Sequence, residues 1–113
     1  MAEGRGTRSA SRAAANESSF RAANEQLAEK AGELGLSEER TPYLCECKEE
    51  RCTTIVRLTM SEYESVRSSP RQFVVAPGHQ EEDERIVMEQ TGFTIIEKTG
   101  EEGQLVEAQD PRS

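Results

Sequence analysis

The chain is poor in hydrophobic residues and has no long apolar run. Only 34% of its 113 residues are hydrophobic and 4% are aromatic, while 32% are charged. No stretch is long or apolar enough to span a membrane, and residues 1–15 lack the apolar region of a secretory signal. We therefore expect a cytoplasmic protein with one modest hydrophobic core.

The sequence also lacks the familiar motifs of catalysis. There is no glycine-rich loop of the kind that holds phosphate and no metalloprotease helix motif. The acidic run 81–84 is better explained by a solvated surface than by acid–base catalysis. These absences favour a non-enzymatic protein, and we assign no catalytic or cofactor-binding residue.

The net charge of -8 disfavours nucleic acid and membranes as partners, because phosphate backbones and anionic lipids repel an acidic protein. A local cluster of arginines leaves a nucleic-acid-binding module as one alternative: Arg51, Arg57, Arg67 and Arg71. We expect the partner to be another protein, and the sequence does not give the oligomeric state.

Three cysteines cannot form a closed disulfide framework, and cytoplasmic cysteines stay reduced. They follow the spacing Cys45-x-Cys47-x4-Cys52, and the single histidine, His79, comes after a Pro-Gly turn. Residues two apart on a strand point to the same side, so Cys45 and Cys47 can face one ion. Cys₃His is a standard ligand set for structural zinc, although paired zinc ligands are usually separated by two to four residues.

Four protein ligands would leave no position open for a reactive water, so we expect Zn²⁺ here to be structural. Lys48 and Arg51, in the turn between the cysteines, would offset the negative charge of three thiolates. One alternative is a thiol-dependent enzyme or redox sensor that uses Cys45 or Cys47. The other alternative is a set of free thiols beside an unrelated surface histidine.

The order of polar and apolar segments predicts a single α+β domain over residues 16–108. We expect residues 1–15 to be a disordered basic tail and residues 109–113 a second disordered tail. Asn16 is a good N-cap for a helix. The apolar stripe of this predicted helix consists of Phe20, Ala23, Leu27 and Ala31.

Short β-rich segments predict a small, mainly antiparallel sheet against which this helix packs. Residues 43–47 and 52–58 form a predicted hairpin, and residues 73–76 and 93–98 form two further strands. Residues 85–90 fit a helix or a strand equally well. Thr59 and Glu62 fit a capping box at the start of a short helix, and Leu105–Val106 follow a glycine-flanked turn as a predicted edge strand.

Four segments resemble a family of small uncharacterised proteins found widely in actinobacteria. They are Asn16-Glu-Ser-Ser-Phe20, Cys45-Glu-Cys47-x4-Cys52, Glu62-Tyr-Glu-x-Val-Arg67 and Phe73-Val-Val-Ala-Pro-Gly-His79. The resemblance runs from Asn16 to the Asp110-Pro-Arg end. It implies a bacterial cytoplasmic protein and supplies no activity, substrate or catalytic residue. The sequence as a whole predicts a non-enzymatic interaction or regulatory protein with a structural zinc site.

Overall fold

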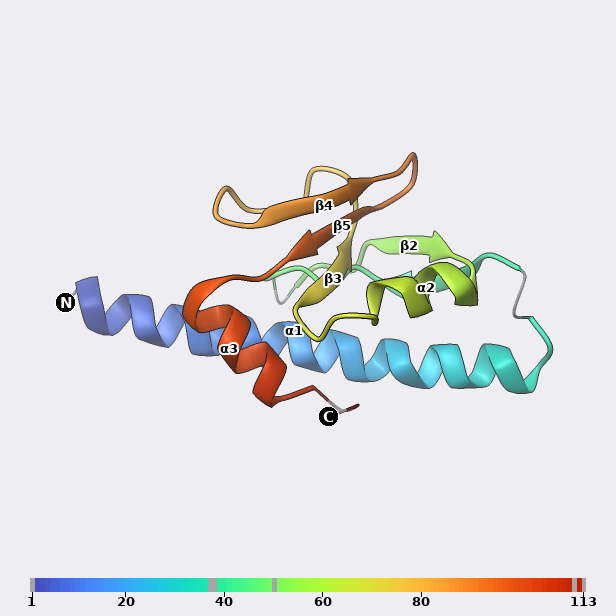
Figure 1. Cartoon of the computed structure of the whole chain (residues 1–113), viewed down its shortest axis with the longest axis horizontal. Helices are drawn as coiled ribbons and strands as arrows, with labels where there is room; N and C mark the ends of the chain where they lie inside the picture. Colours follow the sequence, from blue (N-terminus) through green and yellow to red (C-terminus); the bar gives the residue numbers. More distant parts are fainter. Residues whose placement is uncertain (1, 37–38, 50, 111, 113) are drawn as a thin grey trace.

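A long N-terminal helix forms the base of the molecule. The computed structural model describes residues 2–36, 39–49, 51–110 and 112, without the side chains of residues 2–11 and 13. Helix α1, Ala2–Glu33, has 32 residues and would be about 48 Å long at 1.5 Å per residue. That length accounts for the 50 Å long axis of the molecule, along which α1 runs in Figure 1.

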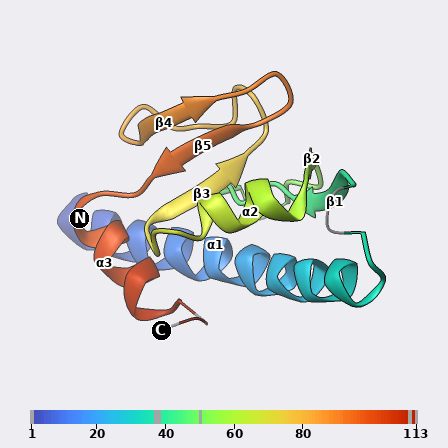
Figure 2. The ribbon, with the colours of Figure 1, turned by 45° about the vertical axis from the view of Figure 1, so that its right-hand side comes forward.

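Two small antiparallel sheets lie on one side of α1 (Figures 1 and 2). Strands β1, Thr41–Leu44, and β2, Ile55–Leu58, pair as the predicted hairpin. Their bounds differ from the predicted 43–47 and 52–58, so all three cysteines lie in the connection between the strands rather than on them. Strands β3, Gln72–Val75, β4, Arg85–Glu89, and β5, Thr94–Glu97, form a second sheet in the order β3-β5-β4. The fold is α+β, as the sequence predicts, and residues 85–89 adopt the strand alternative.

Helix α2, Met60–Val66, begins at the predicted capping box. The Thr59 hydroxyl accepts from the Glu62 N–H, and the Glu62 carboxylate accepts from the Thr59 N–H at 2.8 Å. The helix buries Tyr63 and Val66. The Tyr63 ring stacks on the Tyr43 ring of β1 with centroids 4.5 Å apart. Because the capping box fixes where α2 begins, it also fixes the position of this aromatic pair in the core.

The beginning of α1 differs from the prediction. Residues 2–15 are helical rather than a disordered tail, and Asn16 lies inside the helix instead of capping it. Alanine is the best helix former, and residues 2–15 contain five alanines, at positions 2, 10, 13, 14 and 15. The buried face is also rotated from the predicted stripe, and half of its residues are polar: Ala14, Glu17, Arg21, Asn24, Ala28 and Ala31.

The C-terminal part differs as well. Residues Gly100–Ala108 form helix α3, which packs on α1, so the predicted turn and the Leu105–Val106 strand are wrong. A Cβ atom at Gly103 would lie 2.8 Å from the Lys98 carbonyl oxygen. Glycine at this position therefore permits a close helix–strand contact rather than a turn. Asp110 is buried, which corrects the predicted tail at this residue; residues 111 and 113 lie outside the described part.

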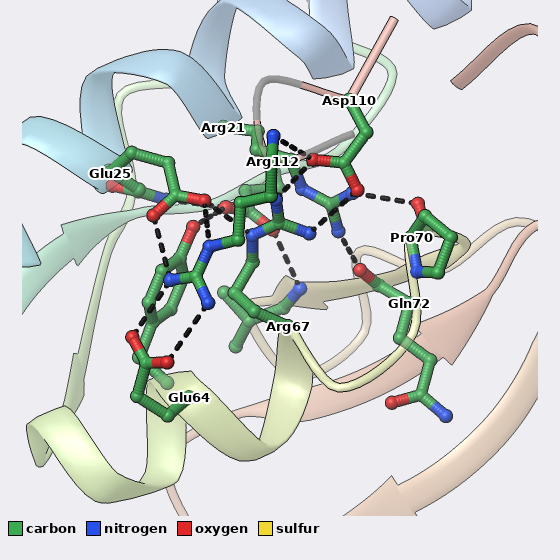
Figure 3. Close-up of polar contacts among 12 residues, drawn as sticks. Arg21, Glu25, Glu64, Arg67, Pro70, Gln72, Asp110 and Arg112 are labelled. Atoms are coloured by element: carbon green, nitrogen blue, oxygen red, sulfur yellow. Dashed lines mark hydrogen bonds and ion pairs between the residues drawn. The ribbon is translucent and has the colours of Figure 1, made fainter. Parts of the chain in front are cut away.

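Buried charges join α1 to the C-terminal segment (Figure 3). Arg67 forms a bidentate ion pair with Asp110, and its Nε donates to Glu25 of α1 at 2.7 Å. Arg112 bridges Glu25 and Glu64. The Asp110 and Arg112 contacts bring the end of the described chain onto α1 and α2.

Arg21 crosses the interior beneath the second sheet. Its guanidinium donates to the carbonyl oxygens of Pro70 and Gln72 and lies 3.6 Å from the centroid of the Phe73 ring. The side chain is 1% exposed. The two carbonyl oxygens and the aromatic ring partly compensate the burial of this cation, whose Nε has no hydrogen-bond partner among the described residues.

Candidate metal centre

The structure brings Cys45, Cys47, Cys52 and His79 together. Their ligand atoms all lie within 4.8 Å of one another. Cys45 and Cys47 directly follow β1, Cys52 precedes β2, and His79 ends the turn after β3. The Gly78 backbone has φ of 85°, and the His79 N–H donates to the Ala76 carbonyl oxygen, so a tight turn delivers the imidazole to the cysteines.

The distances agree with tetrahedral coordination. Zn–S bonds of about 2.3 Å and Zn–N bonds of about 2.05 Å, at the tetrahedral angle, place sulfur and nitrogen about 3.6 Å apart. Nδ1 of His79 lies 3.5 Å from Sγ of Cys45 and 3.6 Å from Sγ of Cys52. The same bond lengths place two sulfurs about 3.8 Å apart, which is inside the 4.8 Å limit of the cluster. The four side chains are therefore compatible with a structural zinc ion.

Backbone contacts hold the cysteines in place. The Cys45 N–H donates to the Thr54 carbonyl oxygen, and the Ala76 N–H donates to Cys45 Sγ at 3.1 Å. An N–H donor stabilises the negative charge of a thiolate and is a typical outer contact of a metal-bound sulfur. The Asn16 amide donates to the carbonyl oxygens of Cys47 and Lys48, and so fixes the turn from α1.

Glu46 lies between two of the cysteines and anchors them from the opposite side. Its backbone N–H donates to the Val74 carbonyl oxygen at 2.8 Å, and its carboxylate accepts from the Val74 N–H at 3.1 Å. The same carboxylate accepts from Tyr63 and Asn24. Residues 45–47 thus run along the outer edge of β3 and connect the two sheets at the candidate metal centre.

The cysteines differ in exposure and acidity. Cys45 and Cys47 are 1% and 4% exposed, and burial raises the pKa of both thiols. Cys52 is half-buried. Its burial opposes ionisation, but hydrogen bonds with Thr54, Cys47 and His79 outweigh that effect and lower its pKa to about 7. Two neutral buried thiols beside a more acidic one would all be deprotonated by a bound Zn²⁺.

In a second cluster, three glutamate side chains lie as close together as the ligands of a metal ion would, but this cluster has a different role. Carboxylate oxygens of Glu17, Glu84 and Glu102 lie within 4.8 Å of one another. The Lys98 ammonium contacts a carboxyl oxygen of each of the three residues, and its side chain is fully buried. The lysine charge occupies the position that a cation would take, so this group is an internal salt-bridge cluster.

Lys48 extends this cluster toward the cysteines. Its ammonium lies 3.3 Å from Glu102 and 3.4 Å from Asp83. The positive charge of Lys48 is therefore already paired with two carboxylates. It is divided between these carboxylates and the predicted role of offsetting the negative charge of the thiolates. Arg51 is exposed.

The four arginines of the nucleic-acid alternative do not form one surface. Arg67 is 6% exposed and is enclosed by carboxylates, and Arg71 pairs with Glu107 on α3. Of these four, only Arg51 and Arg57 are exposed and form no ion pair within the part of the chain that the structure describes. Two separate arginines give a weak phosphate-binding surface on a protein of net charge -8.

Comparisons with known proteins assign no function to this site. Protein-family models, curated proteins and solved structures all gave no match. Across the described residues, no helix combines the length and hydropathy that a membrane crossing requires.

Sequence reasoning found all four candidate ligands but missed the residues that hold them. The sequence predicts a helix cap at Asn16 and assigns no role to Glu46, the acid between two of the cysteines. Glu46 is fully buried. A signal for it was present, since a Cys-Glu-Cys strand that turns both cysteines to one side turns the middle residue to the other.

Proposed function

We propose that the chain is a small zinc protein in which Cys45, Cys47, Cys52 and His79 hold one structural Zn²⁺. The observation that carries the proposal is the agreement between the Sγ–Nδ1 distances of 3.5 and 3.6 Å and the separation expected around tetrahedral zinc. Three thiolates and one imidazole suit Zn²⁺ better than Mg²⁺ or Ca²⁺, which prefer oxygen ligands.

The ion would cross-link the β1–β2 connection to the turn after β3. Without it, those segments are joined mainly by the contacts of residues 45–47 with β3. Because the apolar core is small, the free energy of metal binding would add directly to the stability of the fold.

We further propose that the protein acts as an interaction or regulatory module rather than as an enzyme. All four ligand positions would be protein side chains, so the ion would have no site for substrate or reactive water. The cavity next to Cys47 and His79 measures about 200 Å³, which is below the usual range of small-molecule sites, about 300–1,000 Å³. A protein partner fits this combination best.

Alkylation kinetics test the metal assignment and the coordination together. In zinc-loaded protein all three thiols should react slowly with iodoacetamide, and a chelator should accelerate all three. Mass mapping of the modified cysteines identifies which ones are protected. Equal rates before and after chelation, in protein that remains folded, would refute the zinc site.

A second candidate, thiol chemistry, is favoured by one observation at Cys52. This thiol is half-buried, its pKa is about 7, and its sulfur lies 3.6 Å from the His79 imidazole. The sequence-based alternative placed the reactive thiol at Cys45 or Cys47, whose burial and raised pKa values are less suited to a nucleophile. Thiol chemistry predicts rapid alkylation of Cys52 alone, and chelation would leave that rate unchanged.

A further inference from the structure

The candidate zinc ligands differ in how well solvent reaches them. Cys45 is 1% exposed, and its Sγ accepts from the Ala76 N–H at 3.1 Å, so it lies on the inner side of the cluster. Cys52 is half-buried and is the most exposed of the three cysteines. A cavity of about 200 Å³ adjoins Cys47 and His79. Hydrogen peroxide is only slightly larger than water, so a small oxidant can reach this outer side of the cluster.

The connection between β1 and β2 folds back so that Cys47 and Cys52 meet. The Cys52 N–H donates to the Glu49 carbonyl oxygen at 3.0 Å, and the Cys47 sulfur lies 4.0 Å from the same oxygen. The two thiols also form a hydrogen bond with each other. A disulfide bond of about 2.05 Å between them would close a short loop, residues 47–52.

The other two cysteine pairs fit a disulfide less well. Cys45 and Cys47 lie two apart in an extended segment, in which alternate Cα atoms are about 6.6 Å apart, near the upper limit of about 6.8 Å for a disulfide. A bond between Cys45 and Cys52 would draw the Cys45 sulfur away from the buried Ala76 N–H, which would lose its acceptor. The geometry therefore favours the pair Cys47–Cys52.

We propose that the zinc centre is a redox switch, in which a peroxide joins Cys47 and Cys52 in a disulfide and thereby releases the ion. The switch rests on the proposed zinc site, because the ion is what oxidation displaces. Cys45 and His79 would remain as the only two ligands of the four. Structural zinc requires four protein ligands, so the oxidised site no longer retains Zn²⁺.

The oxidation takes place in two steps on the sulfur atoms. The Cys52 thiolate attacks one oxygen of hydrogen peroxide, the O–O bond breaks, and the departing hydroxide takes up a proton to become water. Coordination slows this attack without abolishing it, because the sulfur keeps unshared electron pairs. The Cys47 thiolate then attacks Sγ of the Cys52 sulfenic acid, the S–O bond breaks, and a second hydroxide leaves as water. Two thiolates lose two electrons, and one peroxide gains them with two protons.

The contacts that join the two sheets do not involve the oxidised sulfurs. The Glu46 N–H donates to the Val74 carbonyl oxygen, and the Glu46 carboxylate accepts from the Val74 N–H. Oxidation thus removes the link between the β1–β2 connection and the His79 turn, while residues 45–47 stay paired with β3. The oxidised protein remains folded but less stable, and reduction by a thiol in the presence of zinc restores the site.

Peroxide titration of the full-length protein tests the switch. Elemental analysis first measures the zinc content, which tests the proposed zinc site separately. One equivalent of hydrogen peroxide is then added with a chromogenic zinc indicator, and a sample without peroxide corrects for zinc lost to the indicator. Peptide mass mapping without reduction locates the disulfide. We expect one ion released per disulfide, a Cys47–Cys52 bond, a free Cys45 thiol, and recovery of bound zinc after reduction.

Two variants isolate the disulfide. Cys52→His removes the proposed bond but supplies a fourth zinc ligand, since Cys₂His₂ sets also hold structural zinc. Peroxide should release its zinc at least about tenfold more slowly than that of the wild type. Met88→Leu is the matched control, because Met88 is 46% exposed and its sulfur is a competing target for peroxide. It should leave the rate of zinc release unchanged.

The disulfide map of the wild type decides the proposal, whether or not Cys52→His retains zinc. Zinc that stays bound after peroxide, zinc released without a disulfide, or a disulfide between another pair of cysteines would each overturn the switch while leaving the zinc site intact. Untreated protein without zinc would refute the proposed zinc site, and the switch with it.

Discussion

Glu46→Ala is expected to be among the most destabilising changes in this protein. The carboxylate is fully buried and accepts hydrogen bonds from Asn24, Tyr63 and the Val74 N–H at 2.8, 2.9 and 3.1 Å. Asn24 would retain its bond to the Leu44 carbonyl oxygen. The Tyr63 hydroxyl and the Val74 N–H would lose these acceptors, and each unsatisfied buried donor costs about 1–3 kcal/mol.

With the cavity left by the side chain, the expected loss is about 3–5 kcal/mol of unfolding free energy. That is a large share of the roughly 5–15 kcal/mol that stabilises a typical domain. Urea unfolding followed by far-ultraviolet circular dichroism, at a fixed excess of zinc, measures the change. Glu29→Ala is the control, because Glu29 is an exposed residue of α1, and it should change stability by less than about 0.5 kcal/mol.

The result that would refute this reasoning is a Glu46→Ala protein as stable as the Glu29→Ala protein. Glu46→Gln gives a finer test. Its amide oxygen can still accept from Tyr63, while its NH₂ group cannot accept from the Val74 N–H. It should therefore lie between the wild type and Glu46→Ala.

Two further predictions concern the other buried charges. Asp110→Ala should lower the unfolding free energy by about 2–4 kcal/mol in the same urea assay, because Arg67 remains buried with Glu25 as its remaining partner; a loss below about 0.5 kcal/mol would contradict it. Burial, followed by a hydrogen bond with Glu102, raises the pKa of Glu17 to about 9 against the attraction of Lys98. The folded protein thus binds this proton more tightly than the unfolded chain, so the stabilisation is complete below about pH 4.5 and is lost as pH rises through 9. Glu17→Gln should flatten this part of the stability–pH profile, and an unchanged slope would contradict the assignment.

The parts of the fold that the sequence predicts are those with a local chemical signature. The capping box at Thr59 appears as expected because its two hydrogen bonds involve residues only three apart. The hairpin β1–β2 follows from β-rich segments on both sides of a charged turn. The candidate metal ligands could be found because cysteine and histidine are so rare in this chain.

The parts that the sequence does not reveal depend on partners far along the chain. The buried face of α1 includes Glu17, Arg21 and Asn24. Glu17 contacts Lys98, Arg21 donates to the carbonyl oxygens of residues 70 and 72, and Asn24 donates to the carbonyl oxygen of Leu44. A search for an apolar stripe therefore selects a neighbouring face. Helix α3 was missed because Gly103 suggests a turn, whereas here it allows close packing against the Lys98 backbone.

The most direct test of the zinc centre is the metal content of protein purified without chelator or metal-affinity resin. Elemental analysis should give about one zinc per chain. Cys47→Ser should lose the metal and much of the thermal stability, whereas Ser61→Ala, an exposed change on α2, should retain both. Wild-type protein that contains no zinc, and whose thermal stability is the same with added zinc as with chelator, would contradict the account.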